Sequence, residues 1–90
     1  MRKYGMSTAY ILINNKPESE IEIINKIKEV AKNAGQSTKY EIQGVYGVYD
    51  IVVKIECDTM EDIRNTLAQI RRIDKIISTI TMLVNEEQET

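Results

Sequence analysis

Two short stretches carry the side chains best suited to binding a small molecule. In Gly47-Val48-Tyr49-Asp50 a glycine is followed by a carboxylate, and in Ser78-Thr79-Ile80-Thr81 hydroxyls recur along the chain. Glycine lets backbone approach a ligand closely, and carboxylates and hydroxyls supply hydrogen bonds. The same residues also have purely structural uses: Gly47 suits a turn, Asp50 can bond nearby backbone, and threonine favours strands.

The residues used in common catalytic and metal chemistry are missing or isolated. The sequence has no histidine, so the most frequent general base and metal ligand is absent. Its one cysteine, Cys57, has no histidine to activate it, which favours an inert thiol and excludes Cys/His zinc sites. No phosphate-binding loop is present, and Gly44-Val45-Tyr46-Gly47 does not match the dinucleotide fingerprint. We expect no enzyme activity, no cofactor and no metal.

The charged side chains follow the pattern of a solvated surface. Most carboxylates fall on the outer faces of two expected helices. A small basic group lies at the second expected helix: Arg64, Arg71, Arg72 and Lys75. This group either complements the negative end of the helix dipole or contacts another subunit or an anion.

The overall charge argues against nucleic acid as a partner. The formal net charge is −2, whereas phosphate binding calls for a basic surface. Tyrosines could stack on bases, but no Lys or Arg lies between Lys39 and Lys54, where three of them fall: Tyr40, Tyr46 and Tyr49. We expect no direct DNA binding.

Size and composition indicate one globular domain over residues 1–90. A hydrophobic share of 42% and a charged share of 29% are typical of folded domains. A single cysteine permits no internal disulfide and suits a reducing compartment. No leader peptide or membrane-length apolar run is present, so we expect a cytoplasmic location and no membrane partner.

The hydrophobic pattern predicts four strands and two helices in the order β-α-β-β-α-β. Both helices should be amphipathic, with stripes at spacings of three and four residues. The first stripe comprises Ile21, Ile24, Ile27, Ala31 and Ala34, and the second comprises Met60, Ile63, Leu67 and Ile70. Pro17 suits the first turn of the first helix, Gly35 its end, and Thr59 with Asp62 resembles a capping box. The strands fall at residues 8–14, 37–43, 49–57 and 76–84.

This order predicts an α+β, ferredoxin-like fold: a four-stranded antiparallel sheet with both helices on one face. The other sheet face would stay open and apolar. We expect it to carry Ile11, Ile13, Val52, Ile80 and Met82, or the opposite set of strand residues. An apolar patch of this kind usually marks an interface, so we expect dimerisation through it.

The stretches Gly47–Asp50 and Ser78–Thr81 also resemble parts of a known family. Gly47-Val48-Tyr49-Asp50, leading into residues 51–55, looks like the G-x-Y-D strand of the effector domain of the Lrp/AsnC transcriptional regulators. Residues 78–82 look like its closing strand, which carries T-x-T, and Ala9-Tyr10-Ile11-Leu12-Ile13 looks like its opening strand. The resemblance runs from about residue 8 to residue 86. The Pro-Gly-Val-like turns common in the family are replaced here, and the seven residues before the first strand supply no helix-turn-helix domain.

The resemblance implies a stand-alone effector domain with a regulatory role and no DNA-binding domain of its own. Dimers would form through the sheet faces and assemble into a ring, such as an octamer or decamer, alone or with full-length regulators. An amino acid or related molecule would bind between dimers. Its site would be lined by Tyr46, Gly47, Val48, Tyr49, Asp50, Thr79 and Thr81. Backbone N–H groups near Gly47 and the threonine hydroxyls suit its carboxylate, and Asp50 suits its ammonium.

Three other functions remain open at this point. Small dimeric enzymes of the monooxygenase or isomerase type share the topology. An ACT-like regulatory module also binds amino acids, but such modules usually pair side by side. A purely structural partner of full-length regulators would bind no ligand.

Overall fold

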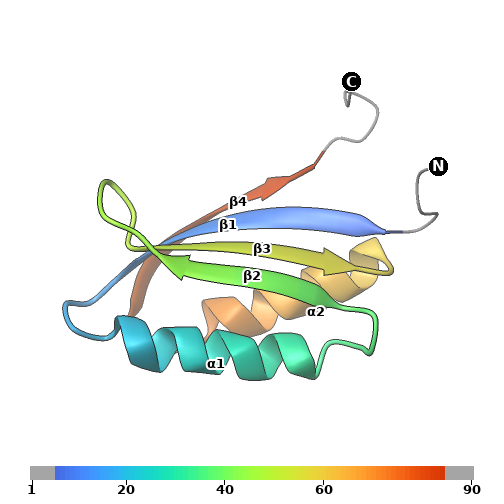
Figure 1. Ribbon diagram of the computed structural model, residues 1–90, viewed down its shortest axis with the longest axis horizontal. Helices are drawn as coiled ribbons and strands as arrows, with labels where there is room; N and C mark the ends of the chain where they lie inside the picture. The colour runs from blue at the N-terminus through green and yellow to red at the C-terminus, as the bar shows by residue number, and fades with distance from the viewer. Residues whose placement is uncertain (1–5, 85–90) are drawn as a thin grey trace.

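The computed structural model describes residues 6–84 and confirms the expected element order. The elements are β1 Ser7–Asn15, α1 Glu20–Lys32, β2 Lys39–Gly44, β3 Ile51–Cys57, α2 Met60–Arg71 and β4 Ile76–Leu83. The strands form one antiparallel sheet in the order β2-β3-β1-β4. Both helices lie on the same face of this sheet (Figure 1). The fold is therefore α+β and ferredoxin-like, as the sequence predicts.

The two central strands build the core by alternation. On β1 and β3 every second side chain faces the helices and is buried: Ala9, Ile11, Ile13, Ile51, Val53, Ile55 and Cys57. The placement of Ile11 and Ile13 on the open face was wrong. They lie opposite Val53 and Ile51 in the β1–β3 register, and directly paired residues share one face. Val52 lies on the open face, as expected.

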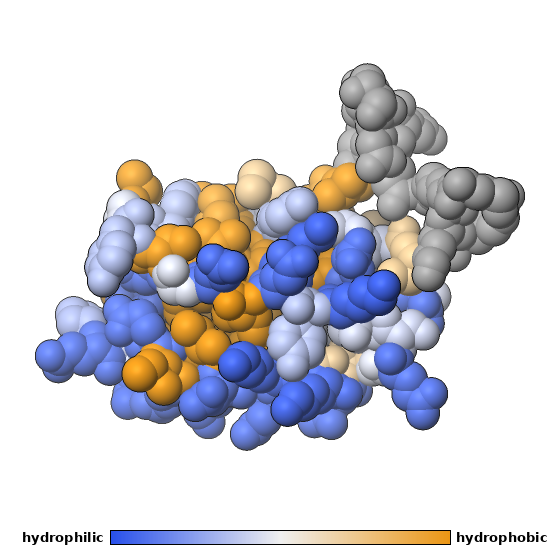
Figure 2. Space-filling view, in the orientation of Figure 1, coloured by the Kyte–Doolittle hydropathy of each residue, from blue (hydrophilic) through white to orange (hydrophobic). Residues whose placement is uncertain are grey.

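The open face carries the alternate residues of the same strands. Leu12 lies at its centre, paired with Val52 on β3 and with Ile80 on β4. Tyr10 lies in the next row, paired with Met82. Ile80 and Met82 are each 47% exposed. Figure 2 shows hydrophobic side chains (orange) over the side of the strands, above a mostly hydrophilic side (blue) where the helices lie.

The first helix keeps most of its predicted stripe, because Ile27 and Ala31 are buried and Ile24 packs against the core, but Ile23 replaces Ile21. It begins at Glu20, after a turn that contains Pro17, and it buries Ile23, Ile27 and Ala31. The predicted Ile21 is 78% exposed. Several isoleucines at the start of this helix allow two overlapping stripes, and packing of α1 on β2 and β3 selects the one led by Ile23.

The second helix follows its predicted stripe. Ile63, Leu67 and Ile70 are buried, and Met60 packs against the core. Thr59 is the N-cap, and its Oγ1 accepts a hydrogen bond from the backbone N–H of Asp62 at 3.0 Å. This is the half of a capping box that satisfies a free helical N–H.

Helix packing is unequal across the sheet. α1 packs mainly on β2 and β3, and α2 packs on β3 and β1. The helix-facing side of β4, at the sheet edge, is left partly uncovered. Its residues are therefore accessible to a ligand or a second chain.

We expect Cys57 to resist thiol reagents in the folded protein. Its side chain is fully buried, and burial raises the pKa of the thiol, while a hydrogen bond from Thr38 opposes this only in part. Because the folded-state pKa is raised, the protonated thiol stabilises the fold below the unfolded-state pKa. That contribution is lost as the pH rises through the folded-state value. Reaction with an aromatic disulfide should be far slower in buffer than in concentrated urea, and equal rates would contradict this burial.

Candidate functional site

The loop between β2 and β3 projects from one end of the sheet (Figure 1). Its base is closed by a hydrogen bond from the N–H of Val45 to the carbonyl of Asp50, at 2.9 Å. Gly47 has φ +138°, and a Cβ added to it would meet nothing within 4 Å, so glycine is required there by backbone conformation and not by crowding. Tyr46 and Val48 extend into solvent, with exposures of 107% and 82%. An isolated protomer therefore displays an aromatic and an aliphatic side chain without partners of their own.

Asp50 joins this loop to the end of β1. Its N–H donates to the carbonyl of Ile13, and its Oδ2 accepts from the N–H of Asn15, both at 2.9 Å. Asp50 therefore bonds to nearby backbone, which is the structural role that the sequence suggests for it. Since a carboxylate accepts several hydrogen bonds, a ligand can still bind to the same side chain.

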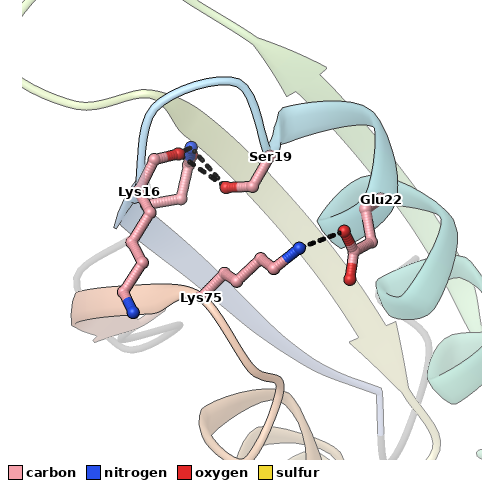
Figure 3. A network of polar contacts seen from close by, with 5 residues as sticks. Lys16, Ser19, Glu22 and Lys75 are labelled. Carbon is pink, nitrogen blue, oxygen red and sulfur yellow. Dashed lines mark hydrogen bonds and ion pairs between the residues drawn. The ribbon is translucent and has the colours of Figure 1, made fainter.

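The turn after β1 contains a network of polar contacts that includes Lys16, Ser19, Glu22 and Lys75 (Figure 3). Asn15 is buried, and its Nδ2 donates to the carbonyl of Lys16 at 2.7 Å and to the hydroxyl of Ser19 at 3.1 Å. The N–H of Lys16 donates to the carbonyl of Lys75, and the Lys75 ammonium lies 2.9 Å from the Glu22 carboxylate. That carboxylate raises the pKa of Lys75. The β1–α1 turn and the start of β4 thus support the residue that holds Asp50.

A cavity of about 530 Å³ lies between this loop and the start of α1. It is lined by Glu20, Gly44, Val45, Tyr46, Gly47 and Asp50. Among residues 6–84, two carboxylates and no basic side chain line it, so it favours a cation such as an ammonium group. Tyr46, Gly47 and Asp50 of the predicted site belong to this cavity, whereas Val48 and Tyr49 do not line it.

Sequence reasoning did not assign Glu20 to the site. In the sequence, Glu20 fits the common pattern of a carboxylate in the first turn of a helix, where its negative charge interacts favourably with the helix dipole. Only the three-dimensional placement of the helix start beside the β2–β3 loop brings Glu20 to the same cavity as Asp50.

The two predicted threonines lie elsewhere in the protomer. Thr79 pairs with Ile13 and Thr81 with Ile11, so both share the helix-facing side of the sheet. Thr81 lines a second cavity, of about 310 Å³, between α2 and β4; its other lining residues are Arg64, Leu67, Arg71 and Leu83. The Thr81 hydroxyl oxygen is buried and has no hydrogen-bond partner.

The structure therefore does not unite the predicted site within one protomer. β2 and β4 are the two edges of the sheet, with β3 and β1 between them. Asp50 leads into β3 and bonds to the end of β1, the neighbour of β4, but it lines the cavity beside α1. Thr81 lines the other cavity, between α2 and β4.

Two further classes of site are not found in residues 6–84. No group of three or more His, Cys, Asp or Glu side chains is placed to hold a metal ion. No helix in this part of the chain is long and apolar enough to cross a membrane.

No protein-family model and no curated protein match the sequence, but solved structures share its fold. AsnC of E. coli is 24% identical with a TM-score of 0.69, over 90% of this chain and 51% of that one. The protein TTHA0845 of Thermus thermophilus is 22% identical with a TM-score of 0.72, over 88% of this chain and 92% of that one. This chain thus spans about half the length of AsnC and nearly all of TTHA0845.

The same fold also occurs in proteins of other kinds. A dimeric ferredoxin-like protein of Bacteroides fragilis is 14% identical with a TM-score of 0.60, over 93% of this chain and 99% of that one. Chlorite dismutase of Candidatus Nitrospira defluvii is 13% identical with a TM-score of 0.65, over 92% of this chain and 41% of that one. The class of the protein is a ferredoxin-like α+β domain. The likeness to AsnC agrees, at the level of the fold, with the family resemblance of the two sequence motifs.

Proposed function

We propose that the chain is an effector domain of the Lrp/AsnC type, which binds an amino acid and acts through oligomerisation. The observation that carries this proposal is that Gly47 and Asp50 of the first motif and Thr81 of the second line two cavities of opposite charge. An α-amino acid carries one positive and one negative group, so it suits a site assembled from both. The fold likeness to AsnC over 90% of the chain supports the same assignment.

Dimerisation through the open sheet face is part of this proposal. The apolar residues of that face gather over β1, β3 and β4: Tyr10, Leu12, Val52, Ile80 and Met82. The β2 side of the same face carries Lys39, Glu41 and Gln43, which are exposed. An apolar centre with a polar border is typical of protein–protein interfaces.

The ligand would bind where the β2–β3 loop of one protomer approaches β4 of another, in a ring of dimers such as an octamer or decamer. Asp50, with Glu20 beside it, would hold the ammonium group. The Gly47 backbone and the hydroxyls of Thr79 and Thr81 would face the carboxylate. Val48 and Tyr49, which do not line the cavity of the isolated protomer, would enter the site through this contact.

A thermal-shift screen with the twenty standard amino acids tests the function. A ligand that binds the folded state at 100 times its Kd should stabilise it by about 2.7 kcal/mol. For a domain of this size, that corresponds to a rise of roughly 10–20 °C in Tm. No shift with any amino acid at 10 mM, in a protein shown to be oligomeric, would favour the purely structural partner of full-length regulators.

The chain by itself should not bind duplex DNA tightly. Its 12 basic residues are outnumbered by 14 acidic ones, so counterion release supplies little affinity. A gel-shift titration at physiological salt should show no complex below about 1 µM, where specific complexes form. A defined complex at nanomolar protein would contradict the effector-only role.

An enzyme is the second candidate, because chlorite dismutase shares the fold. The sequence offers no histidine for it, and no Ser, Thr, Cys or Lys of the described residues lines the acidic cavity beside its carboxylates. An ACT-like module would instead pair its sheets side by side, which dimer geometry distinguishes. A buried free thiol at Cys57 suits the reducing environment of the cytoplasm, where we place the domain.

A further inference from the structure

Arg64 and Arg71 lie on the same side of α2. They are seven residues apart, which is close to two helical turns at 3.6 residues per turn. Both residues belong to the lining of the cavity between α2 and β4. Among the basic residues that the sequence places at this helix, these two converge on one space, whereas Arg72 and Lys75 do not line it.

Among the residues that the structure describes, the cavity supplies positive charge without a matching negative group. None of its lining residues within 6–84 carries a carboxylate. Among residues 6–84 the one ion pair joins Lys75 to Glu22, so neither arginine is neutralised within that range. Guanidinium groups form their strongest hydrogen bonds with carboxylates and phosphates.

Thr81 provides an independent indication of a ligand. Its hydroxyl oxygen is buried and forms no hydrogen bond, and Thr81 lines the same cavity as the two arginines. A buried hydroxyl without a partner destabilises the fold. Such a group is expected where a bound molecule completes the hydrogen bonding.

We infer that this cavity binds a small organic carboxylate with an aliphatic group. Arg64 and Arg71 bind the carboxylate oxygens, the Thr81 hydroxyl donates to one of them, and Leu67 and Leu83 contact the aliphatic part. The volume of about 310 Å³ is at the lower end of small-molecule pockets. This cavity would hold the carboxylate end of the ligand. That the ligand is an amino acid rests on the proposed function.

Two structural uses of the arginines explain less of the geometry. Arg71 lies in the last turn of α2 and complements the helix dipole there, but Arg64 lies in the second turn and does not. Solubility explains exposed arginines on any face of the helix, but not why both line the cavity that Thr81, with its unpartnered hydroxyl, also lines. A bare phosphate would use the guanidinium groups and leave the two leucines in contact with solvent.

Calorimetry with 4-methylpentanoate tests the inference, because this probe has the carboxylate and the aliphatic group but no ammonium. Arg64→Gln and Arg71→Gln should each weaken its binding about 10-fold or more, since each removes a charge-assisted hydrogen bond. Thr81→Val keeps the shape of the side chain and should weaken binding about 5-fold or more. Arg72→Gln is the matched control, since it removes the same charge outside the cavity, and it should leave the affinity within about 2-fold.

The arms of the experiment separate this inference from the proposed function. Binding of 4-methylpentanoate should survive Asp50→Asn, because the probe carries no ammonium for that carboxylate. If it survives while no amino acid binds, the carboxylate cavity stands and the amino-acid function fails. Equal losses in Arg72→Gln and Arg71→Gln would reduce the site to general surface charge and overturn the inference. Inorganic phosphate binding as tightly as 4-methylpentanoate would overturn the role of Leu67 and Leu83.

Discussion

Leu12→Glu should convert the proposed dimer into a monomer. Leu12 lies between Val52 and Ile80 at the centre of the apolar patch on the open sheet face. Residues at the centre of an interface contribute most of its binding energy, and losing such a contact costs about 2 kcal/mol or more. That cost weakens the dimer at least 30-fold. The substitution would also bury one carboxylate from each protomer in the interface, and the desolvation of these two charges weakens the dimer further.

Light scattering after size-exclusion chromatography measures the result at micromolar protein. Gln43→Glu is the matched control, because Gln43 lies in the same row of the sheet, paired with Val52, and is exposed on β2. It adds the same charge at the polar border and should remain dimeric. Circular dichroism should show native secondary structure in both variants. A parent protein that is monomeric at 50 µM, or a Leu12→Glu variant that stays dimeric, would contradict dimerisation through this face.

The order of the strands and helices can be predicted from the local spacing of apolar residues in the sequence. Alternation places the core residues of β1 and β3 on one side, and the spacing of Ile63, Leu67 and Ile70 fixes the inner face of α2. The first helix is less determined, because its apolar residues fit two stripes. Packing of α1 on β2 and β3 buries Ile23 and leaves Ile21 exposed, and that packing is not visible in the helix sequence itself.

The faces of the sheet depend on register, which is a non-local property. Single strands show which residues alternate, but not which set faces the helices when both sets are apolar. Ile11 could therefore be assigned to the open face from sequence. Its pairing with Val53 places it in the core.

The candidate site depends on topology still more strongly. The motifs around Asp50 and Thr81 were recognisable in the sequence, yet their companions were not. Glu20 joins Asp50 only because α1 starts beside the β2–β3 loop, and Arg71 approaches Thr81 only because α2 leaves the helix side of β4 uncovered. In sequence, both companions fit the ordinary pattern of helix-end charges.

Asp50→Asn should abolish most of the amino-acid affinity while retaining the fold. The asparagine side chain keeps an oxygen that accepts the N–H of Asn15, so the link between the loop and β1 persists. It removes the negative charge that pairs with the ligand's ammonium, which is worth about 1.5–3 kcal/mol, or roughly 10- to 150-fold in Kd. Calorimetry with the amino acid found in the thermal-shift screen measures this loss.

Asp50→Ala separates binding from support of the fold. It removes both the charge and the acceptor of the Asn15 N–H, so the affinity should fall as in Asp50→Asn and Tm should fall as well. A backbone group left unsatisfied costs about 1–3 kcal/mol, and each kcal/mol lowers Tm by roughly 4–8 °C in a domain of this size. Glu41→Gln, which removes a carboxylate from the exposed side of β2, should change neither quantity. The contrary outcome is that Asp50→Asn keeps the parent affinity, and that Asp50→Ala lowers Tm without weakening amino-acid binding. In that case Asp50 only supports the β2–β3 loop, and the ammonium binds elsewhere.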